Sequence, residues 1–394
     1  MQGHDHSPFL LNEAARWNDQ GLKSLEQGNL LQARNQIRAA HLLAPQDGRV
    51  LVNLGFSFHA RNQLQAAERC CRLALNSGDS GTIRSATKNL AFLRLEQKDL
   101  CDGWFWYQQQ LQDQNLIQHQ WRGLDDSDSH LLLIWNDMGQ GDAIQFCRYV
   151  PQLIATGYRI RLAVQPELIT LMRHWLHVVA PEHLEVVNSD ADAWNGIERF
   201  ITVLNLCRLL DPTLDQAVNC SHPYLRLQQD RLNNPLPPLP PGRRIGMCWA
   251  SNPGDPSLYQ RKSIPLASLL DGLTRLEHDQ LISLQRGEHT SRHQHRSAFA
   301  AELPDSADWC TTAQWILGCD VVISVDTAVA HLAGALGVPV IVLLPWVKDW
   351  RWHYGRQGQR WYPRCTTIQK TALNDWSSVF KELNAILERE NAIR

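Results

Sequence analysis

SVDTAVAHLAGALG, residues 324–337, is the stretch that decides the fold of this 394-residue chain. An apolar run ends at Asp326, and a helix of small residues is expected to follow it until a glycine stops it. The first amides of that helix, around Thr327 and Ala328, would point at a bound diphosphate. His331 comes four residues after Thr327 and therefore lies on the same helix face. The alternative is that Asp326 or Thr327 only caps the helix, with His331 packed in the core.

Strand-like runs alternate with helical ones on both sides of this stretch, which predicts parallel sheets with helices on both faces. The expected strands are Leu131–Trp135, Ile160–Val164, Leu184–Val187, Phe200–Leu206, Arg244–Ala250, Gln280–Gln285, Asp320–Val325 and Val338–Leu344. A proline-rich segment, residues 233–242, separates the first four from the last four and reads as a stiff connector. We therefore expect two Rossmann-like halves facing a cleft, where nucleotides bind at the strand ends.

The first part of the chain repeats itself with the 34-residue period of tetratricopeptide arrays. The residue pairs that show this period are Gly21 and Gly55, Ala33 and Ala67, and Ala40 and Ala74. Trp17, Pro45, Leu54 and Phe58 also occupy expected positions. A degraded third copy is expected from about Arg84 to Leu111. Unrelated helices with a chance period are the alternative.

Together these features predict an α + α/β fold class. Tetratricopeptide-like helical repeats would occupy residues 1–122, and an N-terminal Rossmann-like domain residues 128–234. A Pro-rich linker over 235–242 would lead to a C-terminal Rossmann-like domain over 243–394. This last domain would end in a helix over Trp376–Glu390.

Composition limits the function classes that need consideration. The formal net charge is −2, so no global field is expected to attract the chain to nucleic acid or to an anionic membrane. The longest apolar run, Val338–Val347, has only about half the length of a spanning helix. No basic segment followed by an apolar stretch marks a secretory signal. We expect a cytoplasmic protein without an integral membrane segment.

Cysteine and acidic patterns give no metal site. The ten cysteines are scattered without CxxC spacing, so we expect reduced thiols rather than a disulfide framework or a zinc site. Asp190 and Asp192 have the DxD spacing of metal-dependent transferases, but this pattern is short and common. A loop turn is the interpretation we favour, and we expect no metal.

A second motif, GQGDAIQF at residues 139–146, directly follows the first expected strand. Gly139 and Gly141 let the backbone turn sharply and leave room for a ligand. Asp142 is then expected at the mouth of the cleft, near a helix N-terminus. Capping of that helix is the alternative role for Asp142, and both roles can coexist.

Six segments in order resemble the transferase module of bacterial tetratricopeptide–glycosyltransferase fusions, which belong to the heptosyltransferase-like, family-nine-related GT-B group. They are LLLIWNDMGQGDAIQFCRYVP (131–151), WASNP (249–253), RKSIPL (261–266), SLQRG (283–287), VDTAVAHLAGALG (325–337) and LLPWVKDWRW (343–352). The resemblance covers about Glu13 to the C-terminus. It implies a GT-B fold of two Rossmann-like domains, a nucleotide-sugar donor and no cofactor.

The resemblance also implies roles for individual residues. Asp142 would be the general base, and Arg261 and Lys262 would offer cations to the donor diphosphate. Asp326 would hold hydroxyl groups of the donor sugar. The remaining donor-binding residues that it implies are Thr327, Ala328 and His331 at the phosphates and Gln285 near the nucleoside.

The chain departs from the family pattern on the acceptor side. Asp137 and Met138 stand where family members carry Glu-Gln, and Gln140 stands where they carry a small apolar residue. Candidates for the acceptor side or the edge of the cleft are Gln145, Trp346, Asp349, Trp350 and Arg351. The aromatic residues among them would either stack on sugar rings or belong to a packed loop.

The expected function is that of an inverting, metal-independent glycosyltransferase. It would move a sugar from a nucleotide sugar to a protein, peptide or glycan acceptor, which the helical array could guide. The alternative is a non-catalytic scaffold, in which the repeats recruit partners and the transferase module has decayed.

Overall fold

The computed structural model describes residues 8–109, 118–124, 131–179, 182–218, 222–227, 234–274, 278–287, 295–354, 361–373 and 375–392. The chain divides into two compact units. Unit 1 consists of Met1–Asp113, Asn252–Arg261 and Val347–His353. Unit 2 consists of Gln114–Ser251, Lys262–Trp346 and Tyr354–Arg394. Two short segments of the expected C-terminal domain therefore belong to the helical unit, which the sequence did not predict.

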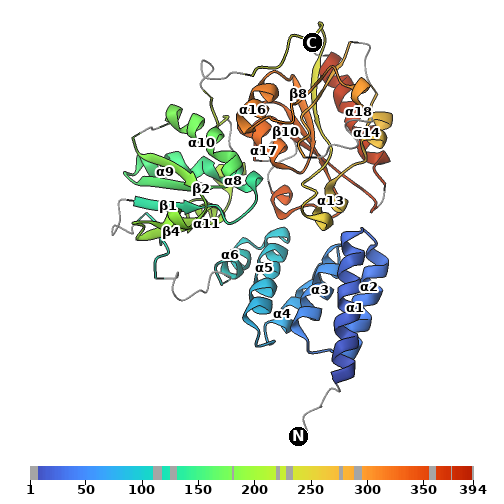
Figure 1. The fold of residues 1–394 in the computed structure, drawn as a ribbon. Coiled ribbons are helices and arrows are strands. Elements are labelled where there is room, and N and C mark those ends of the chain that lie inside the picture. The colour runs from blue at the N-terminus through green and yellow to red at the C-terminus, as the bar shows by residue number, and fades with distance from the viewer. Residues whose placement is uncertain are drawn as a thin grey trace. The chain divides into compact units, whose positions relative to one another are not determined.

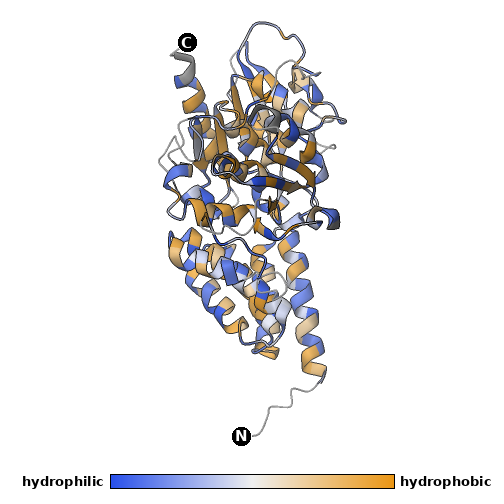
Figure 2. Cartoon of the chain, turned by 90° about the vertical axis from the view of Figure 1, so that its left-hand side faces the viewer, coloured by the Kyte–Doolittle hydropathy of each residue, from blue (hydrophilic) through white to orange (hydrophobic). Residues whose placement is uncertain are grey.

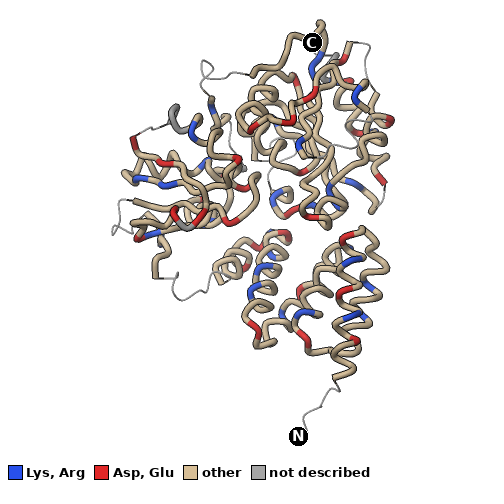
Figure 3. Tube along the Cα trace, in the orientation of Figure 1, with Lys and Arg blue, Asp and Glu red and all other residues tan. Residues whose placement is uncertain are grey.

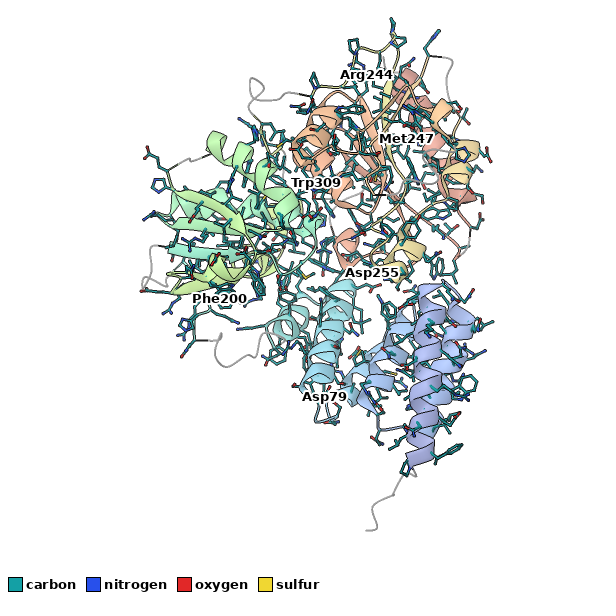
Figure 4. The ribbon with its side chains drawn as sticks, in the orientation of Figure 1. Asp79, Phe200, Arg244, Met247, Asp255 and Trp309 are labelled. Carbon is teal, nitrogen blue, oxygen red and sulfur yellow. The ribbon has the colours of Figure 1, made fainter. Side chains whose placement is uncertain are left out.

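Unit 1 is built on an array of helices that follow one another as hairpins (Figure 1). The pairs are α1 (Pro8–Glu26) with α2 (Leu30–Leu43), α3 (Gly48–His59) with α4 (Leu64–Ala74), and α5 (Ser80–Glu96) with α6 (Leu100–Gln109). Asp79, labelled in Figure 4, caps α5 because its carboxylate accepts the N–H of Thr82 at 2.8 Å.

Small residues let the helices of a pair approach closely. A Cβ atom on Gly21 would collide with Ile37 of α2, and one on Gly55 would lie 3.2 Å from the carbonyl oxygen of Ala67 in α4. The alanines of the 34-residue period, Ala33, Ala40, Ala67 and Ala74, are fully buried. A helical array thus precedes the α/β part, and its tetratricopeptide class remains a prediction.

Two segments from the second half of the sequence pack on the array within unit 1. The first contains most of α13 (Pro256–Lys262), and the second ends in the 3₁₀ turn η5 (Trp350–His353), which lies against α5. Trp350 meets Trp104 of α6 edge-to-face, with ring centroids 5.8 Å apart. Such aromatic pairs add about 1 kcal/mol beyond their buried area.

Unit 2 contains two fully parallel sheets. The first half has the order β3-β2-β1-β4, and the second half has the order β10-β9-β8-β5-β6-β7. The strands of the first half are β1 (Leu131–Trp135), β2 (Arg159–Val164), β3 (Leu184–Asn188) and β4 (Arg199–Thr202). Those of the second half are β5 (Arg244–Cys248), β6 (Gln280–Ser283), β7 (Ala301–Glu302), β8 (Val321–Val325), β9 (Val340–Leu344) and β10 (Cys365–Gln369).

Helices cover these sheets, as the alternation predicted. In the first half they are α8 (Gln140–Phe146), α9 (Val150–Ala155), α10 (Pro166–Val179), α11 (Val203–Leu210) and the short α12 (Asp215–Val218). In the second half they are α14 (Leu266–Gly272), α16 (Trp309–Leu317), α17 (Ala328–Ala335) and α18 (Ser377–Ala392). Figure 2 shows the apolar strands inside this α/β part, and every residue of β8 and β9 is buried.

One strand prediction was wrong in part. The apolar run Phe200–Leu206 was expected to be a strand, but β4 ends at Thr202 and α11 begins at Val203. Strand and helix are both buried here, and so are the two polar residues of the run, Thr202 and Asn205, so no exposed polar residue marks the change. Periodicity cannot separate a buried strand from a buried helix in such a short run. The strands β7 and β10 were not predicted.

Charge and hydropathy agree with an ordinary globular surface. Basic and acidic residues are mixed along the traced elements in Figure 3. Among the described residues, no helix combines the length and the apolar character needed to cross a membrane. The cysteines in the described part of the chain are all free thiols.

Candidate active site

The glycine loop between β1 and α8 is held by side-chain amides. Asn136, the residue after β1, donates to the Oε1 of Gln165 at 2.7 Å, and Gln165 donates to the carbonyl of Met138 at 2.7 Å. The carboxylate of Asp142 accepts the N–H of Gly139 at 3.0 Å. Asp142 therefore does cap α8, and this bond fixes its half-buried carboxylate at the first turn of the helix.

Gly141 allows the two halves of unit 2 to meet at this loop. A Cβ atom on Gly141 would lie 2.9 Å from the Cδ2 of His331 and 3.4 Å from the Cα of Ala328. Any side chain larger than hydrogen would push against α17, so the close approach requires glycine. The structure thus brings the loop that carries Asp142 next to the first turn of α17.

A charged pair lies at the carboxyl end of β8. The Nζ of Lys262 is 2.7 Å from the Oδ2 of Asp326, and the Nε2 of His331 is 3.9 Å from its Oδ1. The side chain of Asp326 is only 5% exposed. Burying a carboxylate is costly unless a cation or hydrogen bonds compensate it. Lys262 is therefore placed to neutralise Asp326.

His331 is neutral at physiological pH. Its pKa is lowered to about 4, mainly by burial; Asp326 raises the pKa, whereas Lys262 and Arg148 contribute to lowering it. Its Nδ1 lies 2.7 Å from the hydroxyl of Tyr362. A neutral imidazole can give or accept one hydrogen bond at each nitrogen. Any contact of His331 with phosphates would accordingly be a hydrogen bond and not an ion pair.

Polar side chains lie around the first turn of α17. Thr327 is the N-cap residue with an extended backbone, and its side chain makes no capping bond to the helix. Its Oγ1 instead lies 3.2 Å from the Oγ of Ser324 and 3.6 Å from the Sγ of Cys248. Helix N-terminal amides favour anions, so the position of Ala328 in this first turn suits the predicted phosphate contact.

Gln285 has a structural role in the second half. Its Oε1 accepts the N–H groups of Trp249 at 3.0 Å and of Ala250 at 2.9 Å. Its Nε2 donates to the carbonyls of Ala250 and Arg286. These bonds join the ends of β5 and β6 and occupy the amide of this buried residue. Contact with a nucleoside stays a prediction.

Arg261 belongs to unit 1, whereas Lys262 belongs to unit 2. The guanidinium of Arg261 lies 5.1 Å from the ring centroid of Phe56 in α3, and its Nε donates to the carbonyl of Ser257. Burial lowers the pKa of Arg261, while Asp255 and other carboxylates of unit 1 raise it. Asp255 is labelled in Figure 4. A diphosphate contact by Arg261 stays a prediction.

The candidates predicted for the cleft edge also belong to two different units. Trp346 is half-buried in unit 2, and its carbonyl accepts from Gln369 at 3.0 Å. In unit 1, Arg351 pairs with Asp349 at 2.7 Å and covers the ring of Trp350 at 5.1 Å. Trp350 is 3% exposed. The packed-loop alternative describes Trp350, because its ring has no surface left for a sugar.

The DxD segment forms a turn. Asp190 accepts the N–H of Asp192 at 3.1 Å and caps the 3₁₀ turn Ala191–Trp194. Within the described ranges, no group of three or more His, Cys, Asp or Glu residues is arranged to hold a metal ion.

Three residues of this region were not among the candidate site residues predicted from the sequence. Arg148, Trp309 and Tyr362 contact the glycine loop, its helix or His331. Arg148 lies in the segment 131–151 that carries the family resemblance, and Tyr362 follows Trp361 in the tryptophan-rich segment between β9 and β10. Neither segment predicts which residues Arg148 and Tyr362 contact.

No protein-family model and no curated relative matches the chain. The solved structures that match the chain include glycosyltransferases. The Escherichia coli heptosyltransferase WaaC with ADP-2-deoxy-2-fluoro heptose is 13% identical, with 66% of this chain and 99% of that chain covered and a TM-score of 0.45. The E. coli ADP-heptose lps heptosyltransferase II is 15% identical over 66% and 99%, with a TM-score of 0.40.

A Thermobaculum terrenum O-GlcNAc transferase mutant covers more of the chain. It is 16% identical, with 87% of this chain and 84% of that chain covered and a TM-score of 0.32. Because all three TM-scores lie below 0.5, these matches say nothing about the roles of single residues in this chain.

Proposed function

We propose that the chain is an inverting, metal-independent glycosyltransferase of the GT-B kind with a tetratricopeptide array. It moves a sugar from a nucleotide sugar to a protein, peptide or glycan acceptor. The observation that carries the proposal is the position of Gly141 against Ala328 and His331. A loop with a carboxylate in the first half thereby meets a helix N-terminus beside the Lys262–Asp326 pair in the second half.

The reaction follows from the chemistry of these groups. The acceptor hydroxyl attacks the anomeric carbon, and its proton passes to Asp142 as the new carbon–oxygen bond forms. Positioned base catalysis of this kind contributes roughly two to four orders of magnitude. The bond to the nucleoside diphosphate breaks on the opposite face of the sugar, which inverts the anomeric centre. Lys262 and the first amides of α17 stabilise the leaving diphosphate.

Replacement of Asp142 by Asn tests this proposal. The amide oxygen can still accept the N–H of Gly139, so the loop should persist, but the amide cannot take a proton. Calorimetric titration with a panel of ADP-, UDP- and GDP-sugars, ADP-heptose included, identifies the donor. D142N should bind that donor like the wild type and lose transfer, measured as release of the nucleoside diphosphate.

Asp190→Asn is the matched control, because Asp190 caps a turn in the same half. It should transfer like the wild type. Unchanged turnover of D142N would remove Asp142 from the mechanism. A second candidate function, a non-catalytic scaffold, is favoured by the structural bonds of Asp142 and Gln285. Absence of binding of every sugar nucleotide at millimolar concentration would support the scaffold.

A further inference from the structure

The N-terminal end of α8 is tied to both halves of unit 2 by Gln140. Its Oε1 accepts the indole N–H of Trp309 at 3.0 Å, and its Nε2 donates to Glu167 of α10 at 3.2 Å. Trp309 begins α16 of the second half and is labelled in Figure 4. The guanidinium of Arg286 lies 4.7 Å from the Trp309 ring. Gln140 is one of the three residues that depart from the family pattern, and its bond to Trp309 connects it to the second half.

The C-terminal end of α8 is tied to the second half by Arg148. Its Nε donates to the carbonyl of Gln145 at 2.8 Å, and its Nη1 donates to the carbonyls of Ala217 at 3.1 Å and Trp361 at 3.0 Å. Its guanidinium lies 4.5 Å from the ring centroid of Tyr224 and 5.2 Å from that of Tyr362. A planar guanidinium can donate in its plane and stack on its faces at once, which an ammonium cannot do.

The aromatic partners of Arg148 are themselves fixed. Trp361 is fully buried and has a positive φ of 63°, a backbone conformation that is costly for a bulky residue and persists only where packing enforces it. Tyr362, next in the chain, places its hydroxyl 2.7 Å from the Nδ1 of His331. His331 in turn meets Gly141. A closed circuit of contacts therefore runs from Arg148 through Tyr362 and His331 back to α8.

We infer that the second half clamps α8 at both ends, and that Gln140 and Arg148 are positioning residues for Asp142. The inference rests on the proposed role of Asp142 as base. Asp142 lies between the two attachment points, two residues after Gln140 and six residues before Arg148. The clamp sets where its carboxylate stands relative to the first turn of α17, so an acceptor hydroxyl meets a base that is already in place.

Two conservative variants test the clamp. Arg148→Lys keeps the charge and removes the planar donor set, and Trp309→Phe keeps a ring under Arg286 and removes the N–H that Gln140 accepts. With the donor identified above, each should lower kcat about tenfold or more, as expected for a misplaced catalytic group. The KM for the donor should stay within about twofold, because Lys262 and α17 are untouched.

Arg243→Lys is the matched control. Arg243 is a buried arginine of the second half that pairs with Asp279 at 2.9 Å and donates to the carbonyl of Leu387, away from α8. It should lower the melting temperature without changing kcat of the folded enzyme. In a D142N background, R148K and W309F should cause no further loss of residual turnover, because positioning and base act as one unit.

Equal kcat for wild type, R148K and W309F, together with an inactive D142N, would overturn the clamp and leave the proposed function standing. An active D142N would overturn the proposed base. Hydrogen exchange measures the clamp without any substrate: the amides of Ala143 to Phe146 should exchange faster in R148K and W309F than in the wild type and in R243K. Unchanged exchange in both variants would overturn the clamp whatever the turnover shows.

Discussion

Lys262 and Asp326 form a charged pair, with the Nζ 2.7 Å from the Oδ2, at the point where β8 leads into α17. The two residues stand 64 positions apart in the sequence. The side chain of Lys262 is 20% exposed and that of Asp326 is 5% exposed. A carboxylate buried to this extent depends on its cation, so the pair links the charge at the candidate site to the stability of the second half.

Replacing Lys262 with Met should therefore lower the free energy of unfolding by about 3 to 5 kcal/mol, the usual cost of leaving one member of a buried pair uncompensated. Urea denaturation at pH 7 measures this. Lys381→Met, on the exposed surface of α18, serves as the control and should change stability by less than about 0.5 kcal/mol. Adding D326N to K262M should recover much of the loss. A fully stable K262M would show that Asp326 does not need the ammonium.

The neutral His331 makes stability depend on pH in a defined window. Its pKa is about 4 in the folded protein against an ordinary value of 6.5. Between these values the unfolded chain binds a proton that the folded chain does not, so stability falls as the pH drops from 6.5 to 4. The loss attributable to His331 is up to about 3 kcal/mol.

Urea midpoints measured from pH 7 to pH 4 check this expectation. His331→Gln should flatten the pH dependence in that window, because Gln carries no titrating group. His278→Gln, at an exposed position, should keep the slope of the wild type. A slope that survives in H331Q would assign the proton uptake to other groups.

The contact between Trp104 and Trp350 tests whether residues 347–353 belong to the helical unit. Trp104 of α6 and Trp350 of η5 contact each other edge-to-face at 5.8 Å, and both are almost fully buried. A double-mutant cycle with Trp104→Leu and Trp350→Leu should give a coupling energy of about 1 kcal/mol. Phe105→Leu, at an exposed position of α6, should show no coupling to W350L. Additive effects of W104L and W350L would show that residues 347–353 do not pack on the array in solution.

The sheets could be predicted from the sequence where a strand is buried on both faces. Val321–Val325 and Val340–Leu344 are fully buried, and such strands of parallel sheets are continuous apolar runs. β10 was not predicted, because its sequence CTTIQ has polar residues at partly exposed positions and is not a continuous apolar run. β4 was extended into α11 because its apolar run continues into a buried helix.

The local parts of the site could be predicted, but not the contacts between them. The glycine loop and the start of α17 both show in the sequence as a strand, a turn and a helix. The bond from Trp309 to Gln140 joins residues 169 positions apart, and that from Arg148 to Trp361 joins residues 213 positions apart. Neither spacing carries a pattern, since both contacts depend on how one half of unit 2 meets the other. The placement of Arg261 and Trp350 in the helical unit was unforeseen because it also depends on contacts between residues far apart in the sequence, with Phe56 and Trp104.

The buried side-chain amide of Gln145 in α8 lowers the stability of the folded protein. The residue is fully buried, and neither its Nε2 nor its Oε1 has a hydrogen-bond partner among the described residues. A buried amide without partners costs about 1 to 3 kcal/mol. Gln145→Met keeps the length of the side chain and removes both polar atoms, so it should raise the free energy of unfolding by about 1 kcal/mol or more.

The matched control is Gln314 of α16, which is also buried but accepts the N–H of Asn234 at 3.0 Å. Gln314→Met breaks that bond and should destabilise the protein by about 1 kcal/mol. Opposite signs for the two substitutions, measured by urea denaturation under the same conditions, are the expected result. A loss of stability in Q145M would mean that the amide has partners in solution, such as a buried water, and that its polarity supports the fold.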